Sequence, residues 1–85
     1  MTGRRTGVAD ESDVAQARVF LTALGAEIAA VTVQLEDARR LAAEARSRGN
    51  APLGAWHEQQ VAAHKKMLRE LHRQTHNLRT RFAVT

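Results

Sequence analysis

Apolar residues recur at alternating intervals of three and four along the first half of this chain, with no polar residue in the series. This is the spacing of one narrow face of an α-helix, which must be buried against other helices. The series, here called the seam, comprises Val14, Ala17, Leu21, Leu24, Ile28, Val31, Leu35, Ala38, Ala42 and Ala45. It predicts a long helix at about residues 10–48.

Local signals predict where this helix begins and ends. Carboxylates at residues 10–13 can cap its first amides, and Gly49 and Asn50 can adopt the left-handed conformation that ends a helix. Pro52 prevents continuation. Gly25 costs about 1 kcal/mol in a helix interior, and a break there would give three helices. The seam passes through Gly25 in phase, which favours one continuous helix.

A second helix is expected at about residues 53–82, after a turn at 49–52. Folding back at this turn pairs residues whose numbers add to about 101, which places Leu71 beside Val31 and Trp56 over Ala45. Together with a flexible tail at residues 1–9, this predicts an all-α, antiparallel two-helix hairpin. The expected helix–helix interface consists of Val14, Leu21, Leu24, Ile28, Val31, Leu35, Trp56, Val61, Leu68, Leu71, Leu78 and Phe82.

Self-association is expected because a lone hairpin leaves part of its apolar surface open. With 85 residues and no cysteine, the chain lacks the disulfides that stabilise many small domains. In the expected register, Val14 and Ala17 project past the end of the second helix. Two hairpins that combine into a four-helix bundle would cover these residues and the open faces, so a homodimer is predicted.

Charge is divided between the two halves of the chain. Residues 10–37 contain six acidic residues and one arginine, whereas residues 39–81 contain ten Lys and Arg and three Glu. This division predicts ion pairs across the hairpin, each worth under about 1 kcal/mol if exposed. The expected pairs are Glu27 with Arg73, and Glu36 or Asp37 with Lys65 and Lys66.

A basic stripe on the second helix is the candidate for phosphate contact. It consists of Lys65, Lys66, Arg69 and Arg73, in a chain of net charge +4 and pI ≈ 11.1. Such a stripe attracts nucleic acid. Glu58 and Glu70 interrupt it, and no aromatic residue is interleaved for base stacking.

The four histidines are candidate sites. His72 and His76 lie one helical turn apart, but two ligands without a cysteine or an HExxH pattern do not form a metal site. His57 and His64 fall in the phase of the seam. There they either reach solvent at its edge or, if buried, loosen the bundle when protonated.

Two short segments resemble known helical families. Leu41-Ala42-Ala43-Glu44-Ala45 resembles the first helix of bacterial helix-turn-helix regulators, which implies a recognition helix near Pro52. Ser47 stands where that motif has an apolar residue. Gly54-Ala55-Trp56 beside the turn resembles the WXG-type helical hairpins of actinobacteria, although the order of tryptophan and glycine is reversed. That resemblance implies architecture and no function.

No nucleophile–base–acid set, phosphate-binding loop or carboxylate pair in a cleft can be identified. The chain is therefore expected to be a non-enzymatic interaction or adaptor module that self-associates and binds a protein partner. The alternative is a basic protein that contacts nucleic acid through the second helix. No cofactor and no small-molecule substrate are expected. No membrane contact is expected either, because Arg18, Glu27, Glu36 and Asp37 interrupt the richest apolar stretch. No apolar run follows Arg4-Arg5, so these arginines are not read as an export signal, and a cytoplasmic location is expected.

Overall fold

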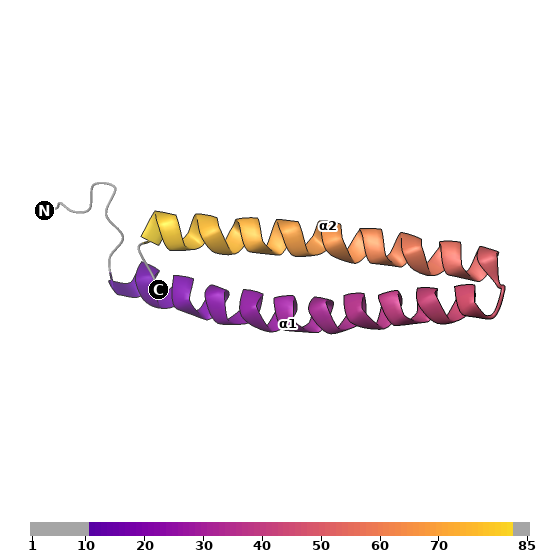
Figure 1. The fold of residues 1–85 in the computed structure, drawn as a ribbon. Coiled ribbons are helices and arrows are strands. Elements are labelled where there is room, and N and C mark those ends of the chain that lie inside the picture. The colour runs from indigo at the N-terminus through magenta and orange to yellow at the C-terminus, as the bar shows by residue number, and fades with distance from the viewer. Residues whose placement is uncertain (1–10, 83–85) are drawn as a thin grey trace, which may run out of the picture.

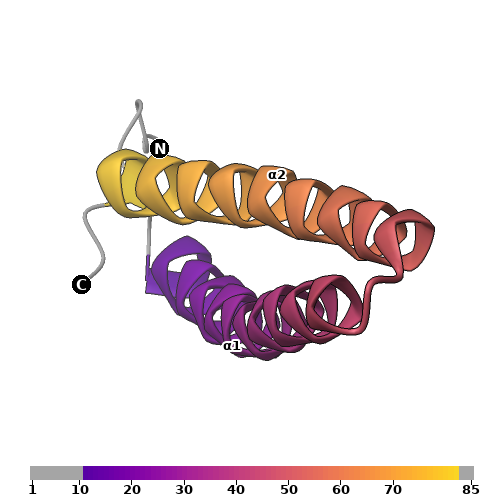
Figure 2. The same cartoon turned by 45° about the vertical axis from the view of Figure 1, so that its right-hand side comes forward.

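The fold is a pair of long antiparallel helices. The computed structural model describes residues 11–82, and it contains α1 (Glu11–Ser47) and α2 (Ala51–Phe82) packed side by side along their length (Figures 1 and 2). This confirms the predicted all-α hairpin. The tail expected at residues 1–9 lies outside the described residues.

The first helix is continuous through Gly25, as the unbroken phase of the seam predicted. A Cβ atom built on Gly25 would meet no other atom within 4 Å, so this glycine serves no close contact within the hairpin. Residues 41–45 lie inside α1, and α2 runs back antiparallel to it. The helix-turn-helix arrangement, whose helices cross at a large angle, is therefore not formed.

Hydrogen bonds at Gly49 and Asn50 connect the turn to the end of α1 and to the start of α2. Gly49 has φ 76°, its N–H donates to the Arg46 carbonyl at 2.9 Å, and the Asn50 N–H donates to the Ala45 carbonyl at 2.8 Å. These two bonds form a Schellman motif. Asn50 also caps α2, because its Oδ1 atom accepts a hydrogen bond from the Leu53 N–H at 3.2 Å.

This cap corrects the predicted start of the second helix. α2 begins at Ala51 instead of residue 53, because Asn50 caps it directly. Pro52 consequently lies in the first turn of α2, where its missing N–H leaves no hydrogen bond unmade.

The core lies along the seam. Its buried members on α1 are Ala17, Val31, Leu35, Ala38, Ala42 and Ala45, and on α2 they are Gly54, Val61 and Leu71. Leu68 packs against the cluster of Leu35, Ala38 and Val61. The other predicted interface residues of this phase are half-buried: Val14, Leu21, Leu24, Ile28, Leu78 and Phe82.

Trp56 does not occupy the place predicted for it. Its side chain is 53% exposed, and Gly54 is buried against the terminal alanines instead. A Cβ atom at Gly54 would lie 3.8 Å from the Ala45 Cβ atom and 3.2 Å from the Arg46 Cγ atom. The helices thus approach closely here, and small residues on both sides leave no room for an indole ring.

The prediction that Ala17 projects uncovered past the second helix is also wrong, because Ala17 is only 3% exposed. Ala17 presents only a single methyl group, which needs little surface to cover it. Val14 is half-buried. The exposed apolar surface of this hairpin lies elsewhere.

Candidate interaction surfaces

A second apolar stripe runs along α1 on the side facing away from α2. It contains Val19 and Val33, which are 68% and 56% exposed, and the exposed alanines at positions 23, 26 and 30 between them. These residues again alternate by three and four, half a helical circumference from the seam. We call this set, Val19, Ala23, Ala26, Ala30 and Val33, the outer seam. Phe20, 54% exposed, lies outside this set, on a side of α1 that is nearer to α2.

With the outer seam added to the seam, the middle of α1 has few polar side chains. Between Val19 and Leu35 the only charged residue is Glu27. α1 is accordingly long and apolar enough to cross a membrane by length and composition alone, and little of the stretch that meets this test is buried in the hairpin. The interruptions expected at Arg18 and Glu36 lie at the two ends of this stretch.

Charged residues close the outer seam at its C-terminal end. Arg40 lies between Asp37 and Glu44 on the same face, with Nη–carboxylate distances of 3.3 Å to each. The hydrogen bond to Asp37, and then that to Glu44, raise the pKa of Arg40 above its ordinary value. Arg40 is therefore already held by two carboxylates.

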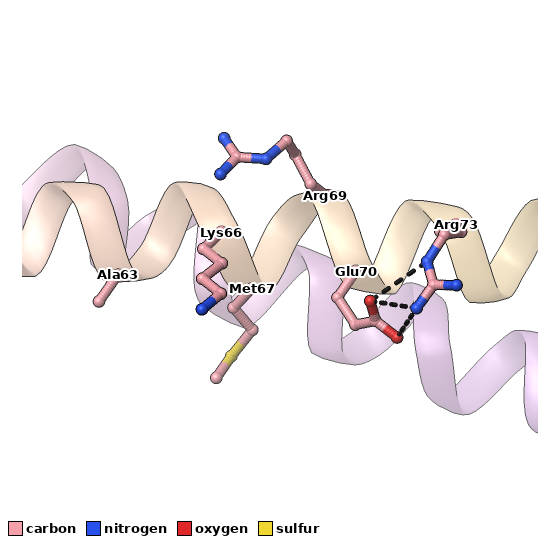
Figure 3. Close-up of a pocket in the computed structure, with 6 residues that line it drawn as sticks. All are labelled: Ala63, Lys66, Met67, Arg69, Glu70 and Arg73. Carbon is pink, nitrogen blue, oxygen red and sulfur yellow. Dashed lines mark hydrogen bonds and ion pairs between the residues drawn. The ribbon is translucent and has the colours of Figure 1, made fainter.

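The outer surface of α2 carries the basic stripe. Lys66, Arg69 and Arg73 lie on exposed turns of this helix beside Met67 and Ala63, and Arg69 extends away from α1 (Figure 3). Arg73 donates to Glu70 through Nε at 3.2 Å and Nη2 at 2.5 Å. These hydrogen bonds, followed by one from Gln74, lower the pKa of Glu70 below its ordinary value.

The predicted ion pairs across the hairpin are not formed. Asp37 bonds Arg40 within α1, and Arg73 bonds Glu70 within α2. Over residues 11–82, Lys65, Lys66 and Arg69 have no carboxylate partner within ion-pair distance. The basic stripe is thus not neutralised by α1. The one ion pair found between the helices in this range joins Arg46 to Glu58 beside the turn.

A hollow of ≈ 270 Å³ lies between the helices near their open end. Phe20 and Leu24 line it from α1, and Leu78 and Arg81 from α2, together with two amide side chains, Gln74 and Asn77. Leu24 and Leu78 were predicted to be neighbours in the register, and they share this hollow. It contains no group suited to nucleophilic or acid–base chemistry.

The histidines do not gather into a site. His72 and His76 are exposed, and His57 and His64 are half-buried at the edge of the interface. The ring of His57 meets Trp56 edge-on, with centroids 5.1 Å apart. In the described part of the chain, no three residues among His, Cys, Asp and Glu are grouped so that they could hold a metal ion.

Comparison of the chain with models of protein families, with curated proteins and with solved structures finds no match.

Proposed function

We propose that this protein is a non-catalytic helical interaction module that acts by associating with copies of itself and with a protein partner. The observation that carries the proposal is the exposure of Val19, Phe20 and Val33 in the middle of a well-formed helix. Exposed apolar side chains of this size, joined by the exposed alanines of the outer seam between Val19 and Val33, form the kind of surface that another protein covers. Burying such side chains stabilises an assembly by about 25 cal/mol per Å² of apolar area.

The shape of the hairpin supports the same conclusion. Its Cα trace extends 70 Å in length but only 16 and 13 Å across, so two helices form its whole thickness. Each helix has one neighbour, and helices that pack on a single side gain less stability than those enclosed in a bundle. Association supplies the second neighbour.

Sedimentation equilibrium of the purified chain at micromolar concentrations tests this proposal. We expect a mass that rises with concentration above the 9.4 kDa of one chain towards that of a dimer. A mass that stays at 9.4 kDa over the whole concentration range would refute self-association.

Nucleic acid binding is the second candidate, and the unpaired cations of α2 favour it. Because Lys65, Lys66 and Arg69 are exposed and lack carboxylate partners in the described range, they are available to phosphates. This candidate predicts binding to duplex DNA or RNA that weakens steeply with salt. The interaction module predicts a sedimentation profile that duplex DNA leaves unchanged.

A charge-reversal pair separates the two candidates. Replacing Lys65, Lys66 and Arg69 by Glu would abolish binding to nucleic acid if α2 contacts phosphates. The matched control replaces Arg18, Arg39 and Arg40 by Glu, which changes the net charge by the same amount on α1. Equal losses in both triple variants would show that net charge acts without a site on α2.

A further inference from the structure

We infer that two copies of this chain associate through one broad side of the hairpin, with their turns at the same end, so that α1 of each copy packs against α2 of the other. This inference deepens the proposed function and rests on it, because it names the surface that self-association uses. Three features carry it: large exposed side chains from both helices, unpaired cations on the opposite side, and the unequal charges of α1 and α2.

Large exposed apolar side chains from both helices lie on one side of the hairpin. Phe20 and Leu41, 54% and 37% exposed, each follow a buried residue of the seam by three positions and so share one side of α1. Leu53 and Met67, 43% and 48% exposed, are two seven-residue repeats apart on α2. Arg81 lies two repeats further along and lines a hollow together with Phe20. These residues therefore lie on a common side, here called the apolar side.

Few charges interrupt the apolar side. The charged residues in its seven-residue series are Glu27, Arg48 and Arg81. Arg48 lies beside the turn and Arg81 near the open end, so an acidic protein or an anionic lipid surface would meet no cation along the middle of this side. The series consists of Phe20, Glu27, Gln34, Leu41 and Arg48, followed by Leu53, Gln60, Met67, Gln74 and Arg81.

Unpaired cations lie on the opposite side of the hairpin. Arg18 and Arg79 line one hollow there, each two positions before a residue of the apolar side and therefore about 200° around its helix. Arg39 and Lys65 share this side through the seven-residue repeat. Over residues 11–82, none of these four cations forms an ion pair. Two copies that meet through their apolar sides turn these cations outwards and keep them apart.

The apolar side is large enough for a stable dimer. The two helices lie beside each other over about 29 residues, a length of about 43 Å at 1.5 Å per residue. Helices about 10–12 Å wide with axes about 8–10 Å apart form a side about 18–22 Å across. The resulting area is roughly 800–900 Å², close to the ~800 Å² that each partner buries in a typical stable interface.

The charges of the helices select one of the two symmetric ways to stack the apolar sides. α1 carries six carboxylates and four arginines, whereas α2 carries two carboxylates and six Lys and Arg. Turns at opposite ends would pack α1 on α1 and α2 on α2, which brings the two basic helices together. Turns at the same end pack each α1 on the α2 of the other copy, so helices of unlike charge meet. Each helix then has two neighbours in a four-helix bundle.

This arrangement supplies Lys66 with a partner. Lys66 extends from α2 in the same direction as Met67 (Figure 3), and over residues 11–82 it forms no ion pair. Asp37 lies three positions after Gln34 and four before Leu41, at the matching edge of α1. With the turns together, residues whose numbers add to about 101 lie at one level. Lys66 of one copy would thus lie about two residues, or ~3 Å along the axis, from Asp37 of the other.

One pair of variants tests the apolar side. Leu41→Glu places a charge in the interface of both copies and should weaken association by about tenfold or more in sedimentation equilibrium. Val33→Glu makes the same charge change in the outer seam and should leave the association constant unchanged. Far-UV circular dichroism of both variants verifies that the helices are retained. Weakening in Val33→Glu but not in Leu41→Glu would assign association to the outer seam and overturn the inference.

A charge exchange tests the contact between Lys66 and Asp37. Lys66→Glu and Asp37→Lys should each weaken association by about tenfold, because the twofold axis creates two like-charged contacts. Lys66→Glu lowers the net charge of +4, so a general charge effect would strengthen association instead. The double variant should regain most of the natural association constant. Failure of the double variant to recover, with helices retained, would refute this contact and the arrangement that produces it.

Single-cysteine variants report which helices meet, because the natural chain contains no cysteine. Gln34→Cys and Met67→Cys lie at one level, so a mixture of these two chains should form a disulfide-linked dimer under mild oxidation. Gln34→Cys that links to itself would place the turns at opposite ends and overturn the inferred arrangement. A mixture of Arg39→Cys and Lys65→Cys, on the opposite side, is the matched control and should remain unlinked on denaturing gels.

The outcomes separate this inference from the proposed function. If the natural chain is dimeric but the mixture of Gln34→Cys and Met67→Cys is not linked faster than the control mixture, another surface is used, and only the inference is overturned. If the natural chain stays monomeric over the whole concentration range, self-association itself fails, and the inference fails with it.

Discussion

Replacing two glycines by alanine should have opposite effects on the stability of the hairpin. Gly49 has φ 76°, a conformation that costs an L-residue about 1–2 kcal/mol. Part of this cost, about 0.4–1 kcal/mol, is offset because alanine restricts the unfolded chain. No atom lies within 4 Å of the added Cβ, so no steric term is added. Gly49→Ala should therefore destabilise the hairpin by about 1 kcal/mol.

Gly25→Ala supplies the matched control, because it is the same chemical change in an unobstructed helix interior. No atom would contact its Cβ either, and alanine is favoured over glycine there by about 0.5–1 kcal/mol. The two variants should thus differ by about 2 kcal/mol, which corresponds to roughly 10 °C in midpoint temperature for a chain of this size.

Thermal unfolding followed by circular dichroism measures this difference. All samples must have one protein concentration, since association shifts the midpoint. Gly49→Asn should recover part of the loss, because asparagine tolerates the left-handed conformation better than alanine. If Gly49→Ala is as stable as the natural chain, or if both alanine variants shift in the same direction, the account of the turn is wrong.

Two further perturbations test the interface and the ion pair on α2. Leu71 is 9% exposed, so Leu71→Ala should lower the free energy of unfolding in urea titrations by about 2–3 kcal/mol. Leu53→Ala, at an exposed position, should lower it by under about 1 kcal/mol. Equal effects of the two variants would contradict the assigned core. Arg73→Gln should raise the pKa of Glu70 towards its ordinary value in an NMR titration. If the pKa of Glu70 does not change in the variant, Arg73 is not the cause of its lowering. Because the pKa of Glu70 is lowered in the folded chain, the stabilisation from this ion pair is present above the ordinary glutamate pKa and is lost as pH falls through the lowered value.

The seam was sufficient to predict the hairpin, because burial along one stripe and a strong stop at Gly49 leave few alternatives. Trp56 lies outside the core for a specific reason. The phase of the second helix, continued back from Val61, passes through His57 and Gly54 and misses Trp56. A large residue near a run of alanines suggested volume matching, but the phase of the helix decides which side chain points inwards.

Electrostatic partners were less predictable than apolar contacts. Asp37 and Arg73 each bond a residue three positions away in their own helix. Such neighbours are held close by the helix itself, so a long side chain loses less conformational freedom in reaching them than in crossing to another helix. The outer seam was not predicted, because the first seam alone accounts for a long helix, although the near absence of charge between Val19 and Leu35 signals a second apolar stripe.

The shared use of Asn50 by both helices has a consequence for how the hairpin opens. Beside this turn, Ala45 and Gly54 are only nine residues apart in sequence, whereas Leu24 and Leu78, which line the hollow at the other end, are 54 apart. The entropy lost in closing a loop grows with its length, so pairs near the turn form first and those at the open end form last. When the hairpin opens, the helices therefore separate first at the end that carries Leu24 and Leu78, while the contacts beside Asn50 remain formed.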